Sequence, residues 1–322
     1  MKAVISKKYG GPNVLEYVDV EKPSIVDDKI LVQIKAASIN QADAYMMQGK
    51  PFPIRFMTGL FKPKYQIKGS DISGIVEEVG SNITDFKTGD EVFGQLVLNQ
   101  NGGYAEYALI PPKQLTKKPN NVTFSEAAAV PMAGLTALQG ARLGEVKKDS
   151  KVLIYGASGG VGTFVIQVCK SMGAHVTAVV STRNIEVAKQ SGADRIIDYK
   201  TTIWDDDNHT YDVIIAVNGY NKLTRYRDKL TDDGRYVVIG GTMKQIFEVM
   251  LKKPFLKKKL QRKFISFTAI VKREDLDTLS SLLESNQLKP HIDKEFELKD
   301  TNLAMKHFFE KKTIGKTIIK LD

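Results

Sequence analysis

The run from Lys151 to Gly162, KVLIYGASGGVG, constrains the fold more than any other part of the chain. Its first half is a short apolar segment typical of a buried parallel strand. Its second half is rich in glycine and leads into a helical pattern over Thr163–Met172. A strand, a glycine turn and a helix in this order form an anion site, because backbone N–H groups and the positive end of the helix dipole face the same point. The sequence therefore predicts a bound dinucleotide pyrophosphate at Ser158, Gly159, Gly160, Val161 and Gly162.

Two other interpretations of this run stay open. The pattern departs from GxGxxG because Ala157 stands at the first glycine position. Ser158 with its flanking glycines also fits GxSxG, the nucleophile elbow of α/β-hydrolases, which likewise joins a strand to a helix. The uncharged stretch Val152–Cys169 reaches the length of a membrane span, although its glycines and polar flanks argue against one.

The residues that follow the second strand favour the dinucleotide. His175–Val180 reads as that strand, and it ends in Ser181, Thr182, Arg183 and Asn184, with no acid. An Asp or Glu here would accept from the ribose 2′-OH of NAD, whereas hydroxyls and a guanidinium suit a 2′-phosphate. The sequence predicts NADPH, with Ser181 and Arg183 at the phosphate. The alternative is that these residues only cap a helix over Ile185–Ser191.

Composition is that of an ordinary globular protein. The chain has 322 residues, 42% of them apolar and 26% charged, which is enough for two domains with substantial cores. The residues after Met1 include no secretory apolar core and no arginine-rich presequence, so we expect a cytoplasmic location. Cys169 is the single cysteine, which excludes an intrachain disulfide.

The net charge of +10 raises the question of an anionic partner. Much of the excess lies in Lys252–Lys263, KKPFLKKKLQRK, which holds seven basic residues and no acid. This segment fits a solvated surface, an anionic membrane contact or a nucleic-acid contact.

Three regions follow one another along the chain. Residues 1 to about 118 contain short alternating segments such as Lys29–Ala36 and Ser73–Val79, typical of a mostly β domain. Strands then alternate with helices, which predicts a parallel sheet. From about residue 265 the pattern of the first region returns. Further strands are expected at Arg195–Ile197, Asp212–Val217, Gly234–Gly240 and Thr317–Leu321, a helix at Asn221–Leu230 and a solvated loop at Asp205–Asp207.

Six segments carry a resemblance that covers almost the whole chain: residues 37–49, 68–80, 86–94, 102–111, 127–141 and 314–321. In this order they resemble the medium-chain dehydrogenase/reductase superfamily, specifically its zinc-independent quinone oxidoreductase branch, which includes zeta-crystallin. The resemblance implies an α/β protein with a GroES-like, mostly β catalytic domain at 1–118 and 266–322. It implies a Rossmann-type, doubly wound parallel-sheet domain at 119–265, a cleft between the two and a homodimer.

The same superfamily contains zinc alcohol dehydrogenases. By resemblance, their zinc Cys falls on Asn40, their zinc His on Ser70 and their adjacent Glu on Asp71. Zinc sites use Cys, His or carboxylate ligands, and Asn40 and Ser70 are poor ones. We therefore expect no metal.

Without zinc, the plausible reaction is hydride transfer to a quinone or an α,β-unsaturated carbonyl, because hydrogen bonds can stabilise the resulting oxyanion. The resemblance places Asn40 and Tyr45 beside the nicotinamide as candidate donors, with Asp43 orienting its neighbours. Alternatively, Asn40 caps a helix and Tyr45 is a core aromatic. Pro51 stands where related enoyl-thioester reductases have a tyrosine, which argues against fatty-acid synthesis.

The resemblance implies further cofactor contacts. It places Thr136 against the nicotinamide, Tyr199 and Arg183 near the adenosine phosphate, and Gly240, Gly241 and Lys316 along the cofactor groove. Two function classes remain open. The first is an NADPH-dependent reductase of quinones or enones. The second is a cofactor-binding protein of the same fold that acts through RNA or membrane binding by Lys252–Lys263.

Overall fold

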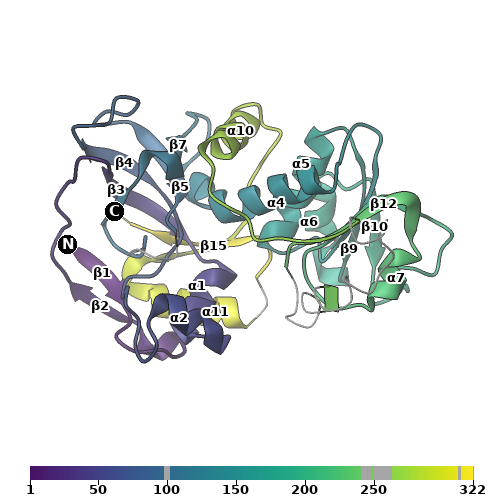
Figure 1. The fold of residues 1–322 in the computed structure, drawn as a ribbon, viewed down its shortest axis with the longest axis horizontal. Helices are drawn as coiled ribbons and strands as arrows, with labels where there is room; N and C mark the ends of the chain where they lie inside the picture. Colours follow the sequence, from purple (N-terminus) through teal and green to yellow (C-terminus); the bar gives the residue numbers. More distant parts are fainter. Residues whose placement is uncertain (98–101, 241–244, 246–247, 250–262, 311–312, 322) are drawn as a thin grey trace. The chain divides into compact units, whose positions relative to one another are not determined.

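The computed structural model describes residues 1–97, 102–240, 245, 248–249, 263–310 and 313–321 (Figure 1). They form two compact units. The first combines both ends of the chain, Met1–Met132, Val271–Asn286 and Ile292–Asp322. The second comprises Ala133–Ile270 and Gln287–His291. The boundary after Met132 lies beyond the residue 118 expected from the sequence.

The first unit is built on a sheet whose order, within the described residues, is β14-β15-β3-β4-β5-β7, with β6 also paired to β3. The pairs are antiparallel except β14 with β15. A separate hairpin-like pair joins β1 and β2. The strands are β1 Lys2–Ile5, β2 Glu16–Asp19, β3 Ile30–Ser38, β4 Asp71–Val79, β5 Glu91–Gln95, β6 Tyr107–Ile110, β7 Leu115–Lys117, β14 Ile292–Glu297 and β15 Lys316–Lys320.

Alternation of apolar and polar residues places one face of these strands in a common core, as the sequence predicts for half-buried strands. Helices cover the remaining apolar surface. The region after residue 265, expected to resemble the β-rich start, also contains the two helices α10 and α11, which bury Leu276, Leu279, Leu283 and Met305. The helices of the unit are α1 Gln41–Gln48, α2 Arg55–Thr58, α3 Phe124–Ala128, α10 Arg273–Glu284 and α11 Thr301–Phe309.

The second unit contains a parallel sheet with the strand order β10-β9-β8-β11-β12-β13. This order reverses direction between β8 and β11, and ligands bind in such folds at the carboxyl ends of the strands at that point. The prediction of a doubly wound parallel sheet is therefore confirmed. The strands are β8 Lys151–Tyr155, β9 His175–Val180, β10 Arg195–Asp198, β11 Tyr211–Ala216, β12 Leu230–Val238 and β13 Phe264–Ser266.

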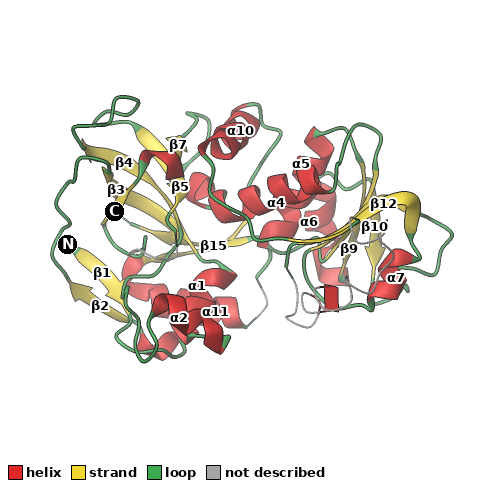
Figure 2. Ribbon diagram, viewed as in Figure 1, coloured by secondary structure: helices red, strands yellow, loops and turns green. Residues whose placement is uncertain are grey.

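Helices flank both faces of this sheet. Figure 2 shows α5 and α6 on one side of the strands and α7 on the other, as right-handed crossovers require when the strand order reverses. The helix expected over Asn221–Leu230 is shorter, because β12 already begins at Leu230. The helices are α4 Pro131–Leu143, α5 Gly160–Ser171, α6 Ile185–Gln190 and α7 Leu223–Arg227.

The interpretation of Val152–Cys169 as a membrane span does not hold, since β8 and α5 divide that stretch. Among the residues that the structure describes, no helix combines the length and the apolar character needed to cross a bilayer.

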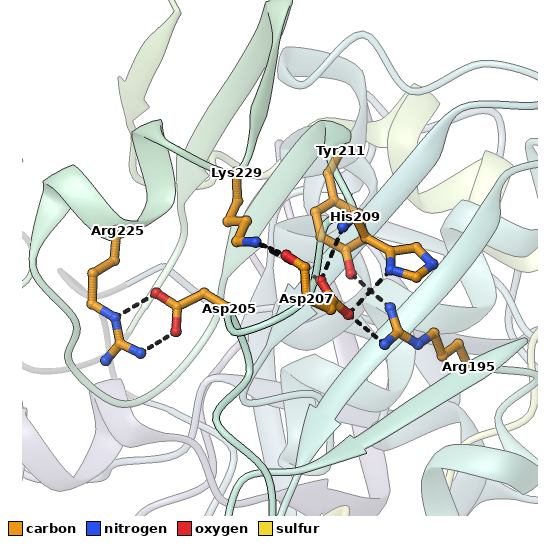
Figure 3. Close-up of polar contacts among 7 residues, drawn as sticks. All are labelled: Arg195, Asp205, Asp207, His209, Tyr211, Arg225 and Lys229. Atoms are coloured by element: carbon orange, nitrogen blue, oxygen red, sulfur yellow. Dashed lines mark hydrogen bonds and ion pairs between the residues drawn. The ribbon is translucent and has the colours of Figure 1, made fainter.

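The acidic run expected to be a solvated loop is largely engaged in ion pairs (Figure 3). Asp205 accepts two hydrogen bonds from the guanidinium of Arg225. Asp207 lies 2.5 Å from Arg195 and 3.2 Å from Nδ1 of His209. Burial opposes ionisation of Asp207, but these partners hold its pKa below the ordinary value. The run therefore ties the segment before β11 to β10 and α7.

Candidate active site and cofactor-binding turn

A tight turn joins β8 to α5, and two of its glycines are required by backbone packing. Gly156 has a φ of +83°, and a Cβ there would lie 2.7 Å from the backbone nitrogen of Asn218. A Cβ at Gly162 would lie 2.5 Å from the carbonyl carbon of Ala157. Glycine alone fits both positions, because any side chain would clash with main-chain atoms. These two glycines are therefore needed with or without a ligand.

Gly159 differs from them, because the space beside it is open. A Cβ at this residue would have no atom within 4 Å. Gly159 is the N-cap of the twelve-residue helix α5, and no side chain caps that end. The first N–H groups of a helix lack acceptors within the helix and carry a partial positive charge. The open cradle and its donors fit a phosphate group, and Ser158, Gly160 and Val161, all partly exposed, border it.

The side chain of Asn184 links the glycine turn to the end of β9. Its Nδ2 donates to Oγ of Ser158 at 2.7 Å and to Oγ of Ser181 at 3.1 Å. Each serine oxygen accepts from the amide, so each hydroxyl keeps its own hydrogen to donate to an anion. Ser158 is thus held by an amide, whereas a nucleophilic serine needs an adjacent base. From the sequence alone, Asn184 is expected only to cap the helix that follows the STRN run, so its contact with Ser158 is new.

The run Ser181–Asn184 contains no acid, but the neighbouring strand β10 places a carboxylate beside it. Asp198, at the end of β10, accepts from Oγ1 of Thr182 at 2.6 Å. This hydrogen bond and the N–H of Lys200 lower the pKa of Asp198. The Thr182 hydroxyl is therefore engaged with a carboxylate. Arg183 lies exposed on the same turn, and Tyr199 is 46% exposed with the Lys200 ammonium over its ring.

The other predicted cofactor residues lie apart from this turn in the sequence. Thr136 is a partly buried residue of α4. Gly240 follows β12, and a Cβ there would lie 2.4 Å from the carbonyl oxygen of Val217, so backbone packing already requires glycine. Gly241 lies outside the described residues, as does the segment 252–262.

A buried polar network occupies the first unit where β3, β4 and β15 meet. The strand register pairs Ser38 with both Asp71 and Ile318, which brings the end of β3 beside the starts of β4 and β15. Oδ2 of Asp71 accepts from Nδ2 of Asn40 at 3.0 Å and from Oγ of Ser38 at 3.1 Å. Oδ1 of Asp71 accepts from the backbone nitrogen of Met132 at 3.0 Å. The carboxyl is fully buried yet has partners at both oxygens.

Lys316 completes this network. Its ammonium donates to Oδ1 of Asn40 at 2.6 Å and lies 3.6 Å from Oδ2 of Asp71. Only 3% of Lys316 is exposed. Burial raises the pKa of Asp71 and lowers the pKa of Lys316, and the attraction between the two opposes both shifts. A lysine expected to line the cofactor groove therefore packs against the candidate donor Asn40.

Asn40 is also the N-cap of α1, as one alternative supposed. Its backbone N–H donates to Asp43 at 2.8 Å, while its side chain belongs to the Lys316 network. Asn40 therefore caps α1 and belongs to the Lys316 network at the same time. Nδ2 makes one good bond, to Asp71, and one long contact of 3.5 Å, to Ser38. One N–H of the amide is thus only weakly engaged.

Asp43 forms a second buried carboxyl site. It accepts from Oγ of Ser70 at 2.6 Å and from the hydroxyl of Tyr104 at 3.4 Å, besides the Asn40 N–H. Burial raises the pKa of Asp43 to about 6, and the bond from Ser70 opposes the rise. Asp43 thus fixes Asn40 and Ser70 in place, which agrees with the orienting role expected from the sequence.

Tyr45 is neither fully buried nor part of the core cluster. Its hydroxyl makes no hydrogen bond to another described residue. The alternative of a core aromatic is therefore not supported by its surroundings.

The positions compared with zinc ligands hold an amide, a hydroxyl and a buried carboxyl. Asn40 and Asp71 already bind the Lys316 ammonium, and Ser70 donates to Asp43. Within the described part of the chain, no group of three or more His, Cys, Asp or Glu side chains could hold a metal ion.

Comparisons with known proteins place the chain in a family. Residues 26–120 match the alcohol dehydrogenase GroES-like domain, and residues 191–319 match the family described as zinc-binding dehydrogenase. The chloroplast envelope quinone oxidoreductase homolog of Arabidopsis thaliana is 31% identical over 99% of this chain and 98% of its own. The chain belongs to the medium-chain dehydrogenase/reductase superfamily.

Other members of the medium-chain dehydrogenase/reductase superfamily support the same placement. The quinone oxidoreductase of Coxiella burnetii superposes with a TM-score of 0.89 and 28% identity, covering 100% of this chain and 99% of that one. The NADPH-dependent alkenal/one oxidoreductase of Arabidopsis thaliana is 32% identical over 76% of this chain and 63% of its own. The predictions of the superfamily, its quinone oxidoreductase branch and the GroES-like plus Rossmann-type fold are confirmed.

Proposed function

We propose that this protein is an NADPH-dependent reductase that transfers hydride to a quinone or an α,β-unsaturated carbonyl without a metal ion. The observation that carries the proposal is the contact of Lys316 with Asn40 and Asp71. A buried ammonium supplies positive charge at the positions where zinc dehydrogenases of this superfamily hold their metal. Reduction of a conjugated carbonyl develops negative charge on oxygen, which fixed donors in a water-poor site stabilise.

The nicotinamide supplies the hydride when the cofactor is bound. The residues of this chain perform the remaining tasks. Asn40 presents its weakly engaged N–H to the developing oxyanion, and Lys316 polarises the amide by binding its oxygen. Tyr45 contributes a second donor, since its hydroxyl has no described partner. Asp43 keeps Asn40 in place through the backbone N–H.

The preference for NADPH is supported by the donors at the end of β9. Asn184 leaves the hydroxyl hydrogens of Ser158 and Ser181 available, and Arg183 adds a charge on the same turn. Asp198 moderates the positive potential there but is already bound by Thr182. A relative 32% identical to this chain is named as NADPH-dependent.

The test is a screen of the purified full chain against quinones, enals, enones, saturated aldehydes and alcohols, with NADPH and NADH compared. We expect oxidation of NADPH with quinones or conjugated carbonyls, unchanged after chelation and dialysis. Activity restricted to saturated aldehydes or alcohols, or activity lost on chelation and restored by zinc, would contradict the proposal.

A further inference from the structure

The segment 50–64 of the first unit holds five of the twelve large apolar side chains that are exposed among the described residues. Phe61 is 88% exposed, Phe56 73% and Met57 69%. Phe52 and Leu60 are 57% and 41% exposed. Single exposed apolar residues are ordinary, but a contiguous group marks an interaction site. These five residues, together with the exposed lysines Lys50, Lys62 and Lys64, form what we call the aromatic-basic patch.

The backbone beneath the patch is held by specific contacts. The hydroxyl of Tyr9 donates to the carbonyl oxygen of Gly59 at 2.6 Å and lies 2.8 Å from Oγ1 of Thr58. The guanidinium of Arg55 donates to the Gly49 carbonyl at 3.1 Å and stacks 4.5 Å from the Tyr9 ring. The rings are therefore displayed by an ordered support.

A tight turn directs the most exposed ring outward. Gly59 has a φ of +115°, and a Cβ there would lie 2.1 Å from the carbonyl oxygen of Lys62, so only glycine allows this turn. Leu60 and Phe61 form the turn's exposed tip. Phe52 and Phe56, a few residues earlier in the chain, lie edge to face with 5.8 Å between their ring centroids. All five exposed apolar side chains therefore come from one short segment, residues 52–61.

The charge around these rings has a single sign. Lys50, Lys62 and Lys64 are exposed, and none has an acidic partner among the described residues. The sequence contains no Asp or Glu between Asp43 and Asp71. A partner must therefore offer both an apolar phase and negative charge.

We propose that the aromatic-basic patch docks the protein onto an anionic lipid surface. Aromatic and methionine side chains would enter the boundary between headgroups and acyl chains, and the lysines would contact the negatively charged headgroups. A second copy of the chain fits less well, because apposed patches would bring lysines against lysines. The inference is independent of the proposed reductase activity, since it concerns binding without cofactor or acceptor.

The experiment measures sedimentation of the full chain with vesicles of phosphatidylcholine, alone or mixed with phosphatidylglycerol. We expect binding to the mixed vesicles that weakens as salt is raised. Phe61→Ser and Phe56→Ser should each weaken it about tenfold, since a phenylalanine transfer contributes about 1.5–3 kcal/mol when complete. Lys62→Gln with Lys64→Gln should weaken it roughly thirtyfold, at about 1 kcal/mol per charge.

Matched controls separate this patch from other surfaces. Ile203→Ser removes an apolar side chain that is 62% exposed elsewhere, and Lys147→Gln with Lys148→Gln neutralises two adjacent exposed lysines. Both should bind vesicles like the wild type. Neutralising Lys257, Lys258 and Lys259 should have less effect than the Lys62 and Lys64 pair. Binding lost in that variant but kept in the patch variants would overturn the proposal.

A spectroscopic readout reports insertion directly. The chain has one tryptophan, Trp204, which is buried. Phe61→Trp should add an emission that shifts to the blue on mixed vesicles and is quenched by brominated acyl chains. Unchanged emission would refute docking. The proposal would also be refuted if the protein self-associated at high concentration and Phe61→Ser abolished that association. RNA binding in place of vesicle binding would refute it as well. So would patch variants that bind vesicles like the wild type but show a changed KM for a water-soluble quinone.

Discussion

The ammonium of Lys316 donates to the side-chain oxygen of Asn40 at 2.6 Å, joining residues from opposite ends of the sequence. The two side chains lie within 3.6 Å of a third group, the buried carboxyl of Asp71. Each of these three buried groups is a hydrogen-bond or ion-pair partner of the other two. Changing one of them alone therefore leaves a buried polar group without a partner.

The first prediction concerns this dependence. Lys316→Met removes the cation and leaves Asp71 uncompensated, so we expect the free energy of unfolding to fall by about 3–5 kcal/mol. Adding Asp71→Asn should restore part of that loss. Urea denaturation of the wild type, both single variants and the double variant measures the coupling. If the two substitutions changed the free energy of unfolding by strictly additive amounts, Lys316 and Asp71 would not stabilise each other.

A second prediction concerns the choice of cofactor. A hydrogen bond to a charged group contributes about 1.5–3 kcal/mol, so Arg183→Ala should weaken NADPH roughly ten- to a hundredfold and hardly affect NADH. Ser181→Asp should go further, because it adds repulsion against the 2′-phosphate and an acceptor for the ribose hydroxyl. Titration of both cofactors decides the matter. Equal losses for NADPH and NADH in Arg183→Ala would remove the basis of the NADPH assignment.

Asn184 should act by orienting two hydroxyls. Asn184→Leu keeps the volume but frees Ser158 and Ser181 to rotate, and we expect about a tenfold loss of NADPH affinity, the magnitude of one hydrogen bond. Asn184→Asp should lose more, because a carboxylate engages the hydroxyl hydrogens and repels the phosphate. Gln190→Leu is the matched control, since that exposed amide bonds only Glu186 among the described residues. Unaltered affinity in Asn184→Leu would exclude the orienting role.

The pH dependence of stability should reveal Asp43. Its pKa in the folded protein is about 6, above the ordinary 3.8, so the folded state binds the proton more tightly than the unfolded state. This contribution to stability is present below about pH 4 and declines as the pH rises to about 6, by about 3 kcal/mol in all. Asp43→Asn should lack that decline, although loss of an acceptor lowers its absolute stability. Urea denaturation at several pH values between 4 and 8 measures the free energy of unfolding of both proteins. The prediction is wrong if this free energy falls equally with pH in the wild type and in Asp43→Asn.

Local patterns predicted much of the second unit correctly. The order of strand, glycine turn and helix at Lys151–Gly162 depends on neighbouring residues alone, and the structure shows it there. The boundaries of α7 were less predictable, because β12 extends back to Leu230 by pairing with Tyr211 of β11. Pairing between distant strands overrode the local helical preference.

The polar network of the first unit could not be predicted from spacing. Nothing near Lys316 in the sequence indicates that its partner is Asn40, because the contact arises from the register of β15 on β3. The bond from Thr182 to Asp198 has the same origin, since β9 and β10 pair side by side. The sequence motifs indicated individual residues, whereas their hydrogen-bond partners depend on how the strands pair in the sheet.

The place of β15 between β14 and β3 also sets the order in which the parts of a growing chain can assemble. A ribosome releases almost all of the second unit before the final strand of the first, and domains fold as units during synthesis. Until β15 emerges, one edge of β3 has no neighbour at Ala36–Ser38, and Asn40 and Asp71 have no lysine. The nascent chain is therefore expected to form the parallel sheet of the second unit before the network of Lys316, Asn40 and Asp71.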